Sequence, residues 1–155
     1  GWGLLQRTLK WAQDTDAGGG RRIAELPWVQ STLAEVYTRL EAMRLMADFE
    51  PRLVGPVLAG TASAHSEINL HLFSESPEAV SLRLDEFGVP HEVQERRVRF
   101  ERDRTVNYPA LRFVAGRQPV DAVVFPLDGI RQSPCSPVDG KPMRRASTAE
   151  VEQLI

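Results

Sequence analysis

The sequence predicts one domain of the α/β class, more closely α+β: a mixed sheet with helices packed mainly on one side and a helical segment at the N-terminus. One indication is the change from helical to strand spacing of apolar residues at Pro51. Another is the expected order of elements, which is helix, strand, strand, helix, three strands and a last helix. Hairpin-connected strands with a helix on one side favour a sheet of mixed direction.

Composition fits one globular unit. The chain of 155 residues is 42% hydrophobic and 26% charged, which is ordinary usage for a folded domain. Its formal net charge of -2 creates no global basic field that would attract nucleic acid. No apolar stretch has the length that a membrane-spanning helix needs. Cys135 is the only cysteine, which favours a cytoplasmic protein, and the start at Gly1 rather than Met favours a trimmed product.

Residues 1–50 are expected to form helices that pack on the core. A short amphipathic helix is expected at residues 4–12, and the Gly-rich run that follows it favours a flexible linker. From Pro27 to Phe49, apolar residues alternate spacings of four and three, which predicts a long helix. Its apolar stripe consists of Val29, Leu33, Val36, Leu40, Met43 and Ala47. The stripe fits packing on the domain's own sheet or, as an alternative, a homodimer seam through residues 27–49.

Residues 51–128 are expected to form the sheet. Five strands are predicted, at residues 53–60, 68–73, 92–100, 111–115 and 120–125. Between the second and third, Ser76 is expected as the N-cap and Pro77 as the first residue of a helix that ends at Gly88. The buried side chains of this helix are expected to be Val80, Leu84 and Phe87.

Residues 129–155 are expected to form an extended loop and a short C-terminal helix, within the same compact unit. Ser147 and Glu150 have the spacing of a capping box before a helix at residues 151–155. The loop carries four cations, which fit two roles equally: facing a polyanionic ligand over the sheet, or fastening the loop to the domain. The arginine-rich hairpin at residues 96–104 also contains acidic residues, so its mixed charge favours a solvated hairpin over a nucleic-acid surface.

The segment from residue 58 to residue 70 carries the most specific pattern in the chain. Gly60-Thr61 follows an apolar strand, and Glu67 and Asn69 are two residues apart on the next strand. Asp121 lies on a later apolar strand. This pattern resembles the signature of the DNA polymerase β-type nucleotidyltransferase superfamily, in which a Gly-Ser or Gly-Thr turn precedes an acidic pair and a third carboxylate follows.

The helix after this pair, followed by Phe87-Gly88-Val89-Pro90, is also similar to the small bacterial antibiotic nucleotidyltransferases. The similarity covers about residues 40–126. The resemblance implies a nucleotidyltransferase-like fold and nucleotide binding. It implies catalytic roles for Glu67 and Asp121, nucleotide contacts at Gly60 and Thr61, and Mg²⁺ ligands at Glu67, Asn69 and Asp121.

The chemistry explains why such a family uses this spacing. Residues i and i+2 of a strand project from one face, so Glu67 and Asn69 project together. A carboxylate from another strand completes an oxygen cage of the kind that Mg²⁺ prefers. Two such ions stabilise the attacking and leaving oxygens of a phosphoryl displacement.

Asn69 departs from the pattern, because its amide oxygen carries no charge. A cage with two carboxylates is expected to hold Mg²⁺ only weakly. The residues therefore favour a catalytically weak or inactive nucleotidyltransferase-like domain that binds a nucleotide or a partner.

Two alternative functions stay open. One is an active Mg²⁺-dependent transferase that moves NMP from an NTP to a hydroxyl acceptor. The other is a helix-mediated interaction module without nucleotide binding. The simplest interpretation of the constellation is also open: Glu67 and Asn69 would lie on the polar face of a strand, and Asp121 would pair with Arg112 on the adjacent strand.

Overall fold

The computed structural model describes residues 27–55 and 67–153, together with residues 7, 10, 11, 13–16, 18 and 22. In the helix that begins at Pro27, side chains are described from Glu35 onward except Val36. The expected Gly60-Thr61 turn and most of the helix expected at residues 4–12 lie outside the described residues. No helix in the described ranges is long and apolar enough to cross a membrane.

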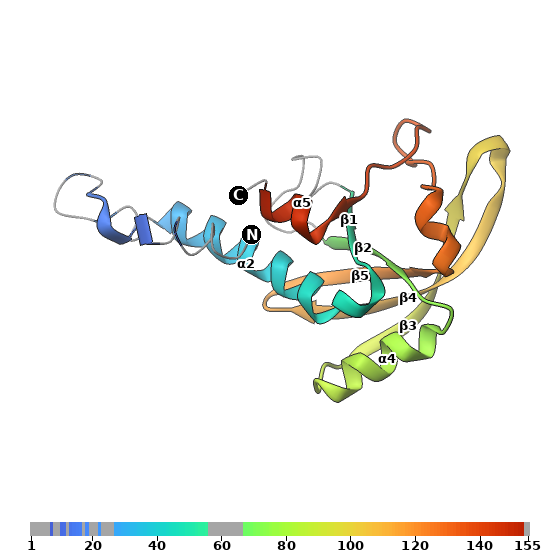
Figure 1. The fold of residues 1–155 in the computed structure, drawn as a ribbon, viewed down its shortest axis with the longest axis horizontal. Helices are drawn as coiled ribbons and strands as arrows, with labels where there is room; N and C mark the ends of the chain where they lie inside the picture. The colour runs from blue at the N-terminus through green and yellow to red at the C-terminus, as the bar shows by residue number, and fades with distance from the viewer. Residues whose placement is uncertain are drawn as a thin grey trace.

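The described chain forms a six-stranded sheet of mixed direction (Figure 1). The order across the sheet is β3-β4-β5-β2-β1-β6, and only β2 and β5 run parallel. The strands are β1 (Arg52–Val54), β2 (Ile68–Phe73), β3 (His91–Arg99), β4 (Thr105–Ala115), β5 (Gln118–Phe125) and β6 (Ala146–Ser147). The prediction of a mixed α+β sheet is confirmed, and β6 is a sixth strand that the sequence did not predict.

One face of the sheet carries the helices. Leu53, Leu70, Ala122 and Leu111 lie in register on four neighbouring strands and are buried. Helices α2 (Pro27–Leu45), α4 (Pro77–Glu86) and α5 (Thr148–Gln153) supply the other side of this core through Leu40, Met43, Val80, Leu84 and Val151. The prediction that the helices pack mainly on one side is therefore confirmed.

The end of the long helix differs from the prediction. The α-helix ends at Leu45, and a 3₁₀ turn, η2 (Ala47–Phe49), completes the segment before Pro51. Because a 3₁₀ helix has three residues per turn, the buried positions shift to Met46 and Phe49. Ala47, expected in the apolar stripe, is exposed.

Strand β4 begins at Thr105 rather than at Leu111, because its first half pairs with β3 alone. The pairing of β4 with β5 ends at Ala110 opposite Val123. The next position is Pro109, which has no N–H to donate to a second neighbour. The β3–β4 hairpin therefore continues beyond the rest of the sheet, where it is yellow in Figure 1.

The capping predictions had different outcomes. The capping box is present, because Glu150 N–H donates to Ser147 Oγ at 3.2 Å and Ser147 N–H donates to Glu150 Oε1 at 3.3 Å. Ser76 precedes α4 as expected, but its hydroxyl donates to Glu78 Oε2 instead of capping a backbone N–H. Phe87 is 61% exposed, so its predicted burial was wrong. It follows the last residue of α4, where the chain turns away from the core.

The buried row of leucines gives a direct test of the helix-covered core. We expect Leu70→Ala to lower the free energy of unfolding by about 2–5 kcal/mol, because it removes a fully buried side chain and leaves a cavity. Urea denaturation measures this loss. The matched control is Leu82→Ala on α4, where the side chain is 58% exposed and the loss should be below about 1 kcal/mol. Equal losses in the two variants would contradict this assignment of the core.

Candidate functional site

The second face of the sheet carries the polar residues that the sequence singled out. Asn69 on β2 lies opposite Asp121 on the parallel strand β5, and Asp121 lies opposite Arg112 on β4. Residues opposite one another in register project from the same face, so these three side chains are neighbours. Glu67 immediately precedes β2 and joins them through an ion pair with Arg112. The structure thus brings Glu67, Asn69 and Asp121 to one face.

We call this surface the polar face. Its central residues are Asn69, His71 and Asp121, and it is bordered by Glu67, Arg52, Arg96, Arg112 and Arg145. Arg52 belongs to it because β1 places it opposite His71. Beside it on the same face, a smaller apolar cluster is formed by Phe73, Phe100, Ala110, Val123 and Phe125. Strand alternation thus separates a helix-covered apolar face from a face that is partly polar.

Both carboxylates of the polar face are paired with arginines. Arg96 Nη2 donates to Asp121 Oδ1 at 2.8 Å, and Arg112 donates to Glu67 Oε1. This hydrogen bond and the charge of Glu67 raise the pKa of Arg112. The simple alternative of an Asp121–Arg112 pair is corrected: the partner of Asp121 comes from β3 and reaches across β4. The arrangement neutralises both acidic side chains.

Asn69 is held in a confined position between β1 and β5. Gly55 follows β1 with a φ of 80°, and a Cβ built there would be 3.0 Å from Asn69 Nδ2. A side chain at Gly55 would therefore be strained and would press on the amide. The amide Nδ2 donates to the backbone oxygen of Glu67 at 3.5 Å. Asn69 thus stabilises the backbone at the start of β2, beside the two carboxylates.

The donor set fits Mg²⁺ poorly. No three or more His, Cys, Asp or Glu side chains among the described residues are grouped so that they could hold a metal ion. One oxygen of each carboxylate, Glu67 Oε1 and Asp121 Oδ1, accepts from a guanidinium group, so a metal cation would be repelled by the charges of Arg112 and Arg96. Asn69 adds no compensating charge. These residues therefore do not form a complete Mg²⁺ site.

His71 and Arg145 form a buried pair beside the carboxylates. Arg145 Nε donates to His71 Nδ1 at 3.0 Å, which requires that Nδ1 carries no proton. Burial, together with the charge of Arg145, lowers the pKa of His71 to about 3. Burial and the charge of Arg52 lower the pKa of Arg145 to about 10. At neutral pH the pair therefore consists of a neutral imidazole and a guanidinium cation.

Arg145 fastens the loop after β5 to the sheet. Its Nη1 donates to the carbonyl oxygens of Gly129 at 2.8 Å and Gln132 at 3.3 Å. Its guanidinium lies 5.0 Å from the ring centroids of both Phe73 and Phe125, within the range of a cation–π contact. Of the two roles that the sequence left open for the loop cations, Arg145 has the fastening role.

Sequence reasoning missed Arg52, Arg96 and Arg145 as members of this face. The available signal was strand alternation, because Glu92, Gln94 and Arg96 share one face of β3. Arg96 was instead assigned to a solvated hairpin on the basis of its mixed-charge neighbours. Arg145 lies 74 residues from His71 in the sequence, and no local pattern connects them.

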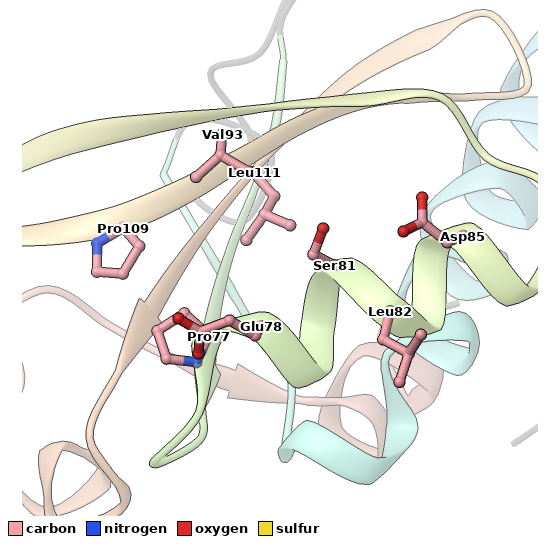
Figure 2. A pocket seen from close by; sticks show the side chains of 8 residues that line it. All are labelled: Pro77, Glu78, Ser81, Leu82, Asp85, Val93, Pro109 and Leu111. Carbon is pink, nitrogen blue, oxygen red and sulfur yellow. The ribbon is translucent and has the colours of Figure 1, made fainter.

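A groove of about 540 Å³ lies on the other face, between α4 and strands β3 and β4 (Figure 2). It is lined by Ser81, Leu82 and Asp85 of α4 and by Val93, Pro109 and Leu111 of the sheet, among others. None of the predicted site residues contributes to it.

A histidine beside this groove fastens α4 to the start of β3. Ser81 Oγ and His91 Nε2 are 2.6 Å apart. His91 Nδ1 is 3.0 Å from the carbonyl oxygen of Val89, which can only accept, so Nδ1 carries the proton and Nε2 accepts from Ser81. A nucleophilic serine would need free backbone N–H groups nearby to stabilise an oxyanion. The N–H groups around Ser81 lie inside α4, where the hydrogen bonds of the helix use them. The contact between Ser81 and His91 is therefore structural.

The low pKa of His71 predicts a specific acid sensitivity. Between pH 6.5 and about 3, the unfolded chain binds a proton at His71 and the folded chain does not. Stability that depends on neutral His71 is thus complete above pH 6.5 and is lost as the pH falls. We expect wild type to lose about 2 kcal/mol more than His71→Gln between pH 7 and pH 5 in urea denaturation. Carboxylates titrate in both proteins, so identical losses would contradict a buried neutral His71.

A family model matches the N-terminal part of the chain. Residues 3–50 match the family model of the acyl-CoA dehydrogenase C-terminal domain. Acyl-CoA dehydrogenase FadE26 of Mycobacterium tuberculosis is 32% identical over 69 residues, which cover 41% of this chain. The aligned part is 17% of that relative's length. The family match ends just before β1, so the polar face lies outside it.

Among solved structures, one of a cytoplasmic RNA terminal U-transferase is similar at 14% identity and a TM-score of 0.38. The superposition covers 79% of this chain and 33% of that one.

Proposed function

We propose that the sheet and its helices form a nucleotidyltransferase-like domain that binds a nucleotide or a partner and has little or no transferase activity. The observation that carries the proposal is the register of β2 against β5. It places Asn69 opposite Asp121, with Glu67 at the start of the same strand, while arginines occupy both carboxylates. Three residues named by the sequence resemblance, Glu67, Asn69 and Asp121, thus lie on one face, and the charges around them disfavour metal catalysis.

The electrostatics support weak catalysis. Transfer of a nucleotidyl group by the expected chemistry needs carboxylates free to ligate Mg²⁺. Here Arg96 and Arg112 already satisfy the two acidic groups, and Asn69 supplies only a neutral oxygen. If these charges remove about 4 kcal/mol of transition-state stabilisation, the rate of transfer falls by roughly three decades. Binding without turnover is the function that these charges favour.

A second candidate function is a helix-mediated interaction module. The segment that matches the acyl-CoA dehydrogenase domain contains α2, the helix for which a homodimer seam was expected. Light scattering over a concentration series separates the candidates. A constant monomer mass would remove the homodimer, whereas a stable dimer without nucleotide binding would favour the interaction module.

We expect wild-type protein to show no appreciable nucleotidyl transfer with Mg²⁺ and the four common NTPs across a panel of hydroxyl acceptors. The physical reason is that each carboxylate is already neutralised by an arginine, whose positive charge opposes a metal cation. Product formation is measured by chromatography of labelled nucleotide. Turnover that disappears with Glu67→Gln or Asp121→Asn would establish the active-enzyme alternative instead.

Restoring the charge should restore metal binding. The double variant Asn69→Asp/Arg96→Gln adds a carboxylate and removes the cation that pairs with Asp121. We expect it to bind Mg²⁺ at least about tenfold more tightly than wild type in calorimetry. Asn69→Asp/Arg97→Gln is the matched control, because Arg97 is the exposed neighbour on the other face of β3. Equal Mg²⁺ affinity in the two folded variants would mean that the constellation is merely the polar face of a strand.

A further inference from the structure

Arginines outnumber carboxylates on the polar face. Four guanidinium groups, those of Arg52, Arg96, Arg112 and Arg145, surround only two carboxylates, those of Glu67 and Asp121. Glu50 forms an ion pair with Arg52 (Nη1 to Oε2, 3.8 Å), and Glu92 lies opposite Arg112. Both of these carboxylates are exposed, so solvent screens their charges more than those of Glu67 and Asp121. The face is therefore locally cationic, although the whole chain has a net charge of -2.

These arginines retain donors. A guanidinium has five N–H groups, and the carboxylates take one described hydrogen bond each from Arg96 and Arg112. The side chains of Arg112 and Arg96 are 32% and 39% exposed, so part of each fork faces solvent. Arg96 Nε is buried without a hydrogen-bond partner in the described structure. A buried donor without an acceptor is energetically unfavourable.

We infer that the polar face binds the phosphate groups of a nucleotide directly through Arg96 and Arg112, without Mg²⁺. This inference rests on the proposed function and specifies how the nucleotide is recognised. Planar guanidinium groups bind phosphate oxygens in pairs, and such charge-assisted hydrogen bonds are about twice as strong as neutral ones. The arginines that prevent Glu67 and Asp121 from ligating a metal thus take over the role that the metal would have toward the phosphates.

The size of the face favours a nucleotide over a nucleic acid. Arg97, next to Arg96, projects from the opposite face of β3, and the row through Asp121 and Arg112 ends at Glu92 on the edge strand. On the other side, Arg145 is held by the loop carbonyls. The cations therefore lie around Asn69, His71 and Asp121 and form no extended basic stripe of the kind that a strand of phosphates would need.

The test is calorimetry of the whole chain with inorganic pyrophosphate and with ATP, first in EDTA and then in excess Mg²⁺. We expect both anions to bind in EDTA and adenosine to bind much more weakly. Excess Mg²⁺ should weaken binding, because it neutralises the phosphates that the arginines recognise. Binding of ATP only in the presence of Mg²⁺ would overturn the inference but preserve nucleotide binding. Absence of binding in both conditions would overturn the inference together with the nucleotide-binding function.

Variants identify the residues. Arg96→Gln is expected to weaken pyrophosphate binding about tenfold in EDTA, whereas its neighbour Arg97→Gln should change it less than about twofold. Arg112→Lys provides a second test that keeps the charge and removes the planar fork, and it should also weaken binding severalfold. Since Arg96→Gln can destabilise the fold by leaving Asp121 unpaired, Arg112→Lys decides in that case. Unchanged affinity in folded Arg112→Lys and Arg96→Gln would overturn the assignment.

Discussion

The ion pair between Arg96 and Asp121 is the interaction on which the polar face depends. Asp121 is only 6% exposed, and its strand lies between β2 and β4 near the centre of the sheet. A buried carboxylate without a partner is strongly unfavourable, and breaking such a pair typically costs about 3–5 kcal/mol. Arg96 provides the compensating charge from the β3–β4 hairpin. The ion pair therefore connects the β3–β4 hairpin to the central strand β5. It also places the Arg96 guanidinium on the polar face.

The two faces of the sheet differ in composition and in what packs against them. The helix-covered face contains the larger apolar core and accounts for the packing of α2, α4 and α5. The opposite face holds a smaller aromatic cluster next to Asn69, His71 and Asp121. Arg145 connects these regions, since its guanidinium stacks on Phe73 and Phe125 and donates to His71. The polar side chains thus lie on hydrogen-bonded strands, which would keep the entropic cost of the proposed binding low.

Local patterns in the sequence predicted much of the fold. Periodicity located α2, α4, β2 and β5, and the Ser147–Glu150 spacing identified the capping box before α5. Periodicity failed in two places: β4 continues through Pro109 because its first half pairs only with β3, and β6 contains only two residues. The candidate site was predictable only in part. Alternation placed Glu67 and Asn69 together, and the sequence resemblance suggested Asp121. The arginine partners of the two carboxylates lie on strands that are far away in the sequence. Which arginine pairs with which carboxylate depends on the strand order, which no local sequence pattern predicts.

Arg112 and Arg96 neutralise Glu67 and Asp121. The most direct measurement is anomalous scattering from crystals of the wild-type chain soaked in Mn²⁺, which replaces Mg²⁺ at oxygen-rich sites. The account predicts no anomalous peak between the two carboxylates, with the guanidinium of Arg96 remaining on Asp121. A Mn²⁺ ion coordinated by both Glu67 and Asp121, with Arg96 displaced, would contradict it.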